Sequence, residues 1–456
     1  MNASRPASID PMIARYAARP APRYTSYPTA PQMRPGFTTE AWAGWLSGVE
    51  PTAPVSLYLH VPFCRKMCWY CGCNMKLVAR ESVLDAYVED LLAEIDLVAA
   101  ALPGRMSVGH LHFGGGTPTA LSPQALTRVM ARLSLRFDFA EDAEIAIESD
   151  PRTLTPEMIE TIGALGFTRA SFGVQEFDPA VQAAINRIQP PEMVAAAVAG
   201  LRRAGVASVN FDLIYGLPKQ TVAALENTAR LCAAMRPDRL ALFGYAHVPW
   251  MAKNQRMIAD ADLPGAAERI AQAEAAAAAL RAEGYAPIGI DHFALPGDAL
   301  TQAARAGGLR RNFQGYTTDA AGTLIPFGAT AIGRTREGIV QNLAETGAWS
   351  RAVREGRLPV AKAVALDDDD RARAWVIERL MCDFAADMGE ATRRFARPEG
   401  WWSDAAAALA PMVADGLATV EGERVALTPR GRPLARVAAS AFDAYLGAGA
   451  RHSVAV

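Results

Sequence analysis

The 456-residue sequence has no run of 18 apolar residues and therefore no candidate transmembrane helix, and its first twenty residues lack the apolar core of a signal peptide. Its 46 Lys and Arg nearly balance its 48 Asp and Glu, for a formal net charge of −2. This balance gives no reason to expect nucleic acid or an anionic membrane as a partner. We expect a cytoplasmic protein that binds neither, and any anion site must be local.

Cysteine is scarce, with six residues in all, and four of them lie between Cys64 and Cys73. This is not the even scatter of a disulfide framework, so a reducing compartment is expected. The other two, Cys232 and Cys382, stand alone in stretches with helical patterning. We interpret them as small buried hydrophobic residues.

The clustered cysteines have the spacing Cys-x3-Cys-x2-Cys at Cys64, Cys68 and Cys71, directly after an apolar strand. Three thiolates can converge there, and thiolate is a preferred ligand of both iron–sulfur clusters and zinc. Structural zinc sites are usually built from paired cysteines far apart in the sequence, which favours a cluster with one iron open to a small molecule. Cys73 could be a fourth ligand or could lie on the far side of the turn.

With 51% hydrophobic residues, the chain can bury a large core and is long enough for two or three domains. Strand patterns alternate with helical patterns six times, which predicts parallel strands joined by helices in an open sheet or a partial barrel. The expected strands are 57–61, 111–113, 144–148, 169–174, 208–213 and 239–245. The expected helices are 81–102, 122–135, 156–165, 191–204, 222–235 and 266–283.

Unusual polar residues follow each of these strands. They include the triple glycine 114–116 and, among the charged and amide residues, Glu148, Gln175, Arg187 and Asp212. Each is ordinary by itself, but the carboxyl ends of parallel strands share one edge of a sheet or barrel, where active sites form. The polar set is therefore expected to converge on one mouth.

The flanking segments divide the chain into three expected parts. Residues 1–54 form an N-terminal arm with a short helix, residues 55–330 form the barrel with a loop-rich connector, and residues 331–456 form a mostly helical C-terminal domain with a winged-helix-like end. Within the barrel part, 285–293 is expected to form one further strand. The acidic run 367–370 is interpreted as the start of a helix. The arm segment 23–29 could wrap the surface or form the rim of an active site.

Several longer motifs stand out along the chain. They are Arg23-Tyr-Thr-Ser-Tyr-Pro28, Tyr58-Leu-His-Val-Pro-Phe-Cys64, Cys71-Gly-Cys-Asn74, Gly114-Gly-Gly-Thr-Pro118, Gly173-Val-Gln-Glu-Phe177, Asp212-Leu-Ile-Tyr-Gly-Leu-Pro-Lys219, Asp291-His-Phe-Ala294 and Arg311-Asn-Phe-Gln-Gly-Tyr-Thr-Thr318. Together they resemble the radical S-adenosylmethionine (SAM) superfamily and, within it, the oxygen-independent coproporphyrinogen III oxidase family. The resemblance extends from the arm to the C-terminal helices, with small departures at Leu295 and Tyr70.

The resemblance implies an α/β fold with a partial (β/α)6 barrel and a [4Fe-4S] cluster on Cys64, Cys68 and Cys71, with Cys73 beside it as a catalytic residue together with Tyr58. It also implies two SAM molecules. The residues around the cluster-bound SAM would be Tyr58, Tyr70, Gly115, Glu148 and Ile332. Those around the second would be Gly116, Thr117, Gln175, Arg187, Asp212 and Ala246.

The implied reaction is the oxidative decarboxylation of two propionates of coproporphyrinogen III to vinyl groups, giving protoporphyrinogen IX. The implied electron donor is a protein such as flavodoxin or ferredoxin, and a monomer is expected. Because the substrate has four carboxylates, we expect cations at the mouth, with Arg23, Arg310 and Arg311 as candidates.

Two other readings belong to different functional classes. A haem-binding chaperone from a sister branch would share the cluster and the barrel, but that branch lacks the fourth cysteine and the arm, and this chain has both Cys73 and the segment 23–28. A simple electron carrier would leave the glycine loop and the strand-end polar residues without a role.

Overall fold

The computed structural model describes residues 10–447. Residues 1–9 of the expected arm and 448–456 of the expected C-terminal domain lie outside this range. The strands are β1 (Arg34–Pro35), β2 (Val55–Val61), β3 (Phe63–Cys64), β4 (Lys76–Leu77), β5 (Ser107–Gly115), β6 (Asp138–Ser149), β7 (Arg169–Gln175), β8 (Ser208–Tyr215), β9 (Arg239–Gly244), β10 (Ala286–Ile288), β11 (His292–Ala294), β12 (Arg310–Asn312), β13 (Gly315–Thr317), β14 (Thr323–Phe327), β15 (Ile332–Arg334), β16 (Gly338–Asn342), β17 (Val360–Ala365), β18 (Ala385–Asp387), β19 (Ala418–Glu421) and β20 (Arg424–Leu427).

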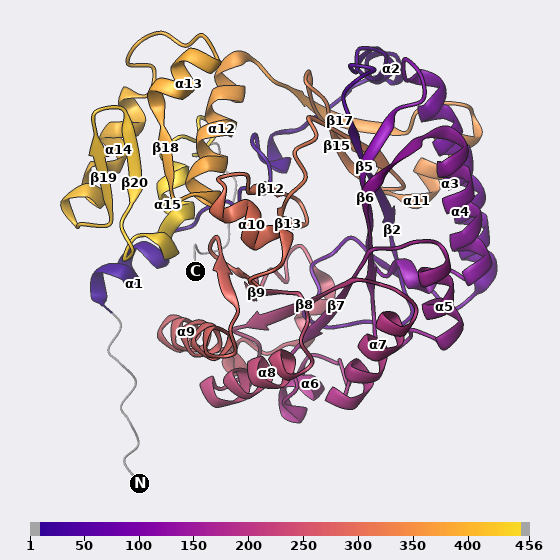
Figure 1. Ribbon diagram of the computed structural model, residues 1–456, viewed down its shortest axis with the longest axis horizontal. Coiled ribbons are helices and arrows are strands. Elements are labelled where there is room, and N and C mark those ends of the chain that lie inside the picture. Colours follow the sequence, from indigo (N-terminus) through magenta and orange to yellow (C-terminus); the bar gives the residue numbers. More distant parts are fainter. Residues whose placement is uncertain (1–9, 448–456) are drawn as a thin grey trace.

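Helices cover the outside of the large sheet and form most of the C-terminal region (Figure 1). They are α1 (Pro11–Ala17), α2 (Thr39–Ser47), α3 (Glu81–Ala101), α4 (Pro123–Arg136), α5 (Pro156–Ala164), α6 (Pro179–Ala184), α7 (Pro191–Arg203), α8 (Val222–Ala234), α9 (Ala266–Ala282), α10 (Ala299–Arg305), α11 (Thr346–Arg354), α12 (Asp368–Cys382), α13 (Met388–Arg394), α14 (Ser403–Ala414) and α15 (Ala435–Ser440).

The six expected strand–helix alternations are confirmed. Strands β2, β5, β6, β7, β8 and β9 pair in parallel in this order, as a partial barrel requires. The helices start where the local chemistry favours it. The side chains of Ser122, Thr155 and Thr221 accept the backbone N–H of the third residue of α4, α5 and α8. Each such cap stabilises its helix by about 1 kcal/mol.

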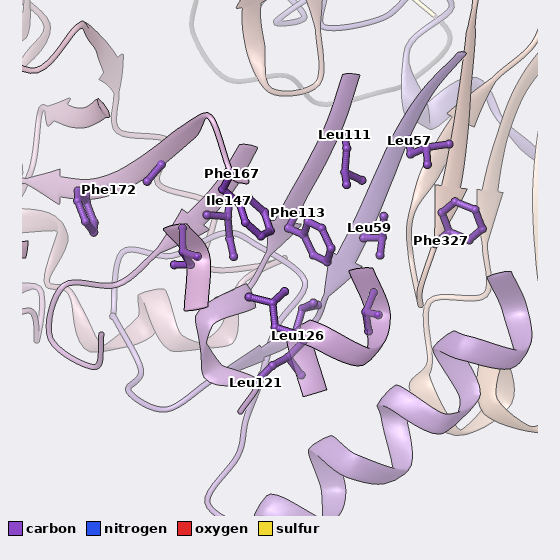
Figure 2. Close-up of a cluster of buried hydrophobic side chains, with 14 of the residues drawn as sticks. Leu57, Leu59, Leu111, Phe113, Leu121, Leu126, Ile147, Phe167, Phe172 and Phe327 are labelled. Carbon is purple, nitrogen blue, oxygen red and sulfur yellow. The ribbon is translucent and has the colours of Figure 1, made fainter. Parts of the chain in front are cut away.

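The two faces of the parallel strands have different chemistry. Leu57 and Leu59 of β2 and Leu111 and Phe113 of β5 are buried against the helices (Figure 2). Because side chains alternate along a strand, the residues between them, such as Tyr58, point to the opposite face inside the barrel. Apolar burial therefore orients the polar residues toward one interior.

The sheet extends beyond the six expected strands. Within residues 10–447, thirteen strands form one sheet, in which β14 pairs in parallel with β2 and is followed outward by β15, β16, β17 and β1. The expected boundary after residue 330 would separate β14 from β15, which are paired neighbours. Residues 332–365 thus continue the large sheet, which the sequence does not signal because short paired strands resemble loops. We propose a boundary between β17 and α12.

The structure also corrects the expectation of a single strand over 285–293. This segment is an antiparallel hairpin of β10 and β11, and β11 pairs in turn with β9. Gly289 turns the chain with a φ of 56°, and the ring of Tyr316 occupies the space where a Cβ would lie. Only glycine tolerates both conditions.

A second core lies in the C-terminal region, where β18, β20 and β19 form a small sheet beside helices α12 to α15. The N-terminal arm belongs to this core. Tyr24 donates a hydrogen bond to Asp443 at 3.0 Å, and Tyr27 accepts one from the Ala444 N–H at 3.0 Å. The arm therefore ties the C-terminal helices to the barrel. Within residues 10–447, no helix has both the length and the apolar character needed to cross a membrane.

Two further expectations, the buried lone cysteines and the acidic run at a helix start, are confirmed. Cys232 and Cys382 are buried, with 0% and 5% of their surface exposed. At the acidic run, Asp367 caps α12 by accepting the N–H of Asp370, and the Asp370 side chain accepts the N–H of Asp367 in return. The run is therefore a helix start.

Candidate active site

The cysteine loop, residues 64–73, begins at the carboxyl end of β2. At its base, β3 pairs in parallel with β4, and the Val78 N–H donates to the Cys64 carbonyl at 3.0 Å. On its other side, the side-chain amide of Asn254 donates to three carbonyls of the loop, those of Cys68, Trp69 and Cys71, at 3.0, 3.1 and 2.8 Å. Asn254 was missed by sequence reasoning, since a lone asparagine in a loop gives no signal.

Further hydrogen bonds from distant segments shape the same loop. Gln255 donates to the Tyr70 carbonyl at 2.8 Å, and Asn186 donates to the Met67 carbonyl at 2.8 Å. The Trp69 N–H donates to the Ile185 carbonyl at 3.0 Å. Groups from the segments that follow β7 and β9 therefore fix the conformation of the loop.

Each of the three expected ligand sulfurs takes part in a hydrogen bond. The hydroxyl of Thr117 lies 3.3 Å from Cys64 Sγ, and the Cys73 N–H donates to Cys71 Sγ at 3.4 Å. Cys68 Sγ accepts from Arg152 at 3.1 Å and from Arg187 at 3.3 Å. Donors facing sulfur stabilise thiolate and tune an iron–sulfur cluster. All six cysteines are free thiols, so this donor set fits a cluster on Cys64, Cys68 and Cys71.

The thiol environments differ. The hydrogen bonds from Cys73 lower the pKa of Cys71 to about 7, whereas burial raises the pKa of Cys64 to about 11. Cys73 itself is exposed. Among residues 10–447, no three His, Cys, Asp or Glu side chains are gathered closely enough to hold one metal ion.

Arg187 and Arg152 share one buried carboxylate, Asp150. Arg152 pairs with Asp150 at 2.6 Å and Arg187 at 3.5 Å. Burial opposes the ionisation of Asp150, but the two guanidinium groups hold its pKa below the ordinary value. Asp150 and Arg152 directly follow β6, a position that could have identified them.

The glycine loop after β5 packs against the cysteine loop and β2. A Cβ on Gly116 would lie 2.7 Å from the Phe63 carbonyl oxygen, and one on Gly115, whose φ is 112°, would lie 2.8 Å from the His60 ring. The Gly115 N–H donates to Glu148 at 3.2 Å, and His112 lies 3.1 Å from the same carboxylate. The backbone can therefore approach a ligand closely here.

Gln175 and Asp212 lie on neighbouring strands β7 and β8. Gln175 adopts a φ of 67° at a register shift, and its buried Oε1 has no hydrogen-bond partner among the described residues. A buried acceptor without a donor is costly, and a hydrogen-bond donor on a ligand would satisfy it. Burial and the charge of Glu148 raise the pKa of Asp212 to about 7.

Tyr58 and Ile332 come together through strand register. Pro326 of β14 is the partner of Tyr58, and Leu324 is the partner of Arg334, so Ile332 lies beside Pro326 and two strands from Tyr58. The Tyr58 hydroxyl lies 2.9 Å from His60 Nδ1. Tyr70 packs at the edge of an apolar cluster that contains Tyr245, and the Ala246 carbonyl accepts from Gln255 at 3.2 Å.

Comparisons with known proteins agree with this geometry. The Radical SAM superfamily model matches residues 58–232, from β2 to α8, and this match defines the class of the barrel. The HemN C-terminal domain model matches residues 366–434, which begin where the large sheet ends. A [4Fe-4S] cluster and SAM are the cofactors of this class, and the donor set of the cysteine loop fits them.

Relatives identify the branch. The oxygen-independent coproporphyrinogen III oxidase of Bradyrhizobium diazoefficiens is 50% identical over 443 residues, 97% of this chain and 98% of its own length. The protein of the same name from Paracoccus denitrificans is 41% identical over 438 residues, 95% of this chain and 96% of its own. The solved coproporphyrinogen III oxidase of Escherichia coli, a radical SAM enzyme, is 39% identical with a TM-score of 0.89, covering 93% of this chain and 98% of that one.

The chain belongs to the oxygen-independent coproporphyrinogen III oxidase family. The haem-chaperone alternative is not favoured, because relatives that match nearly the whole chain carry the oxidase name.

Proposed function

We propose that this chain removes two propionate carboxylates of coproporphyrinogen III oxidatively and leaves vinyl groups, which gives protoporphyrinogen IX. The observation that carries this proposal is the cysteine loop at the barrel mouth, in which each of three sulfurs faces a hydrogen-bond donor. When bound, the cofactors would supply an organic radical able to remove a hydrogen atom from the propionate β-carbon. Loss of CO2, and of one electron to an acceptor, would then leave the vinyl group. The protein must position the substrate and keep water and stray hydrogen donors away from that radical.

We propose that two SAM molecules bind side by side. The cluster-bound one contacts Tyr58, Tyr70, Gly115, Glu148 and Ile332, and the register that brings Ile332 toward Tyr58 supports this set. The second contacts Gly116, Thr117, Gln175, Arg187, Asp212 and Ala246, and the unpartnered Gln175 Oε1 supports that set. Carboxylates such as Glu148 and Asp212 suit ribose hydroxyls and the positive sulfonium.

Cys73 and Tyr58 are the proposed catalytic residues. Cys73 is exposed, and its N–H donates to the expected ligand Cys71, which places it beside the cluster. Tyr58 faces the barrel interior, and its hydroxyl is in contact with His60. Each side chain carries a proton that can be transferred to or from a bound substrate.

A cleft of about 560 Å³ lies between the extended sheet and the C-terminal helices. The arm tyrosines Tyr24 and Tyr27 line it, together with Phe313 and Trp375. Its apolar and cationic lining suits a tetrapyrrole with carboxylate side chains. We propose that the substrate reaches the barrel through this cleft.

For the partners, we propose a reduced flavodoxin or ferredoxin as electron donor, a monomeric protein, a cytoplasmic location, and no binding of nucleic acid or membrane. Six free thiols and a nearly neutral net charge support this set.

An anaerobic assay of the protein with a reconstituted cluster, SAM and coproporphyrinogen III tests the proposal. We expect singly and then doubly decarboxylated product, with one SAM cleaved for each propionate lost. Stoichiometric haem binding without any turnover would contradict it.

A further inference from the structure

Four arginines from four separate segments approach the carboxyl ends of β8 and β9. We call them the mouth arginines: Arg23 of the N-terminal arm, Arg269 of α9, Arg311 of β12 and Arg436 of α15. They come from both the barrel and the C-terminal region, so they meet only in the folded chain.

Arg23 and Arg269 lie side by side on the end of β9. Arg23 donates to the Gly244 carbonyl at 3.1 Å, and Arg269 donates to the neighbouring Tyr245 carbonyl at 2.9 Å. The Arg269 guanidinium lies 5.6 Å from the centre of the Tyr215 ring. A Cβ on Gly244 would lie 3.2 Å from Arg269 Nη2, so the glycine leaves room for this guanidinium.

Arg311 is buried without a full set of partners. Its side chain is 4% exposed, it contacts Asp291 at 3.6 Å, and it lies over the Tyr316 ring at 4.5 Å. Among the described residues, its Nε and Nη1 have no hydrogen-bond acceptor. Buried guanidinium N–H groups without acceptors are costly, and an anion that reached them would relieve that cost.

Three of these charges have few partners. Within residues 10–447, neither Arg23 nor Arg269 forms an ion pair, and Arg311 has Asp291 as its carboxylate partner. Burial opposes the ionisation of Asp291, but Arg311 and His292 lower its pKa to about 2. Burial and the charge of Arg23 lower the pKa of Arg436 to about 10. Mutually repelling arginines weaken the folded protein unless an anion joins them.

We propose that the mouth arginines bind carboxylates of the tetrapyrrole substrate. This inference rests on the proposed function, and it names where the substrate's negative charge is held. The site adjoins Ala246 and the strand of Asp212, so a substrate anchored there lies next to the proposed SAM pair. Planar guanidinium groups bind carboxylates in a bidentate way, which fixes orientation as well as position.

The methionine carboxylate of SAM has the same chemistry and is the other source of a ligand for this site. The substrate is favoured because it brings four carboxylates to several guanidinium groups. In addition, Arg187 already lies within the residues proposed for SAM. The experiment separates the two sources by measuring each ligand alone.

The test uses the cluster-containing full chain with Arg269→Gln and Arg436→Gln. Fluorescence titration with coproporphyrin III, without SAM, should give a Kd about 10- to 100-fold higher for each variant. SAM binding without porphyrin should be unchanged, as should the cluster absorbance. Arg269→Lys should recover part of the affinity. The control is Arg230→Gln on α8, which removes an exposed ion pair with Glu226 and should bind coproporphyrin III like the parent.

Two further measurements make the outcome specific. The tetramethyl ester of coproporphyrin III should bind the parent and both variants equally, because it has no carboxylate. The Arg269→Gln variant should unfold at a temperature no lower than the parent, since it loses a buried charge that is repelled by Arg23. Unchanged coproporphyrin III affinity in both variants, or a loss of SAM affinity instead, would overturn the inference. Absence of porphyrin binding and turnover in the parent would contradict the proposed function itself.

Discussion

Two groups of arginines lie at the barrel mouth and differ in how they are partnered. On the side of the cysteine loop, Arg152 and Arg187 both pair with Asp150 and both donate to Cys68. On the side of β8 and β9, Arg23 and Arg269 donate only to backbone carbonyls, and Arg311 has free N–H groups. In the first group, Asp150 and the expected cluster ligand Cys68 offset the positive charge. The second group has positive charge that the protein does not offset and that can bind the carboxylates of a substrate.

The largest effect is expected from removing a cluster ligand on the balanced side. Cys68→Ala should lose the cluster iron and all product formation, because two guanidinium groups would then face no thiolate. Iron content, the visible absorbance of the cluster and the anaerobic assay measure this. As a comparison, Cys232→Ala, a buried cysteine in α8, should keep the cluster. A Cys68→Ala protein with normal iron content would show that the ligand set is wrong.

The next effect separates Cys73 from the ligands. Cys73→Ser should keep the cluster and SAM binding but lower turnover by about 100-fold or more, as expected when a proton-transfer group is lost. Iron content and single-turnover product formation provide the two readouts. If the iron is lost in this variant, Cys73 is a ligand and the division of the four cysteines fails.

A pH profile tests the polar residues between the two arginine groups. Burial and Glu148 raise the pKa of Asp212 from 3.8 to about 7, so it becomes ionised as the pH rises through 7. SAM affinity should therefore increase between pH 6 and pH 8. Asp212→Asn should bind SAM about tenfold more weakly at pH 8 and lose this pH dependence.

The same shift predicts the stability of the ligand-free protein. The unfolded carboxyl ionises near 3.8 and the folded one near 7. The parent should therefore lose stability relative to Asp212→Asn as the pH rises from about 4 to about 7. Thermal unfolding at both ends of this window measures the difference. A parent that gains stability relative to Asp212→Asn over this window would contradict the shift.

The smallest effect is expected at Arg310, next to Arg311 on β12 but with its side chain turned toward α12. Arg310 pairs with Glu378 at 3.2 Å and is 32% exposed. Arg310→Gln should change the coproporphyrin III Kd by less than about threefold, the scale of an exposed ion pair. Arg311→Gln should raise it much further. Equal effects would remove the distinction between the two arginines.

The barrel was predictable from the sequence because its strands and helices carry strong periodic patterns. The six parallel strands and their helices appear close to the expected ranges. The hairpin at Gly289 and the strands β14 to β17 were not predictable. They are short, and their pairing partners are far away in the sequence, so local pattern carries little of the information that places them.

The candidate site also divides into residues that the sequence identified and contacts that only the structure shows. Cysteine spacing identified the candidate cluster ligands, because loop geometry is local and three thiolates within eight residues can meet wherever the loop is placed. The three hydrogen bonds from Asn254 to the cysteine loop became visible only in the packed structure, as did the pairing of Asp150 with two arginines.

The sequence alone thus determined the chemistry of residues 64–73 and the order of strands that carry the polar set. Tertiary structure alone decided which arginines meet. Arg23, Arg269, Arg311 and Arg436 are separated by 42 to 413 positions in the sequence, and alternation along β12 sends Arg310 to α12 and Arg311 to Asp291. Electrostatic contacts depend on distance in space, and that distance is set only when the C-terminal helices and the arm pack against the barrel.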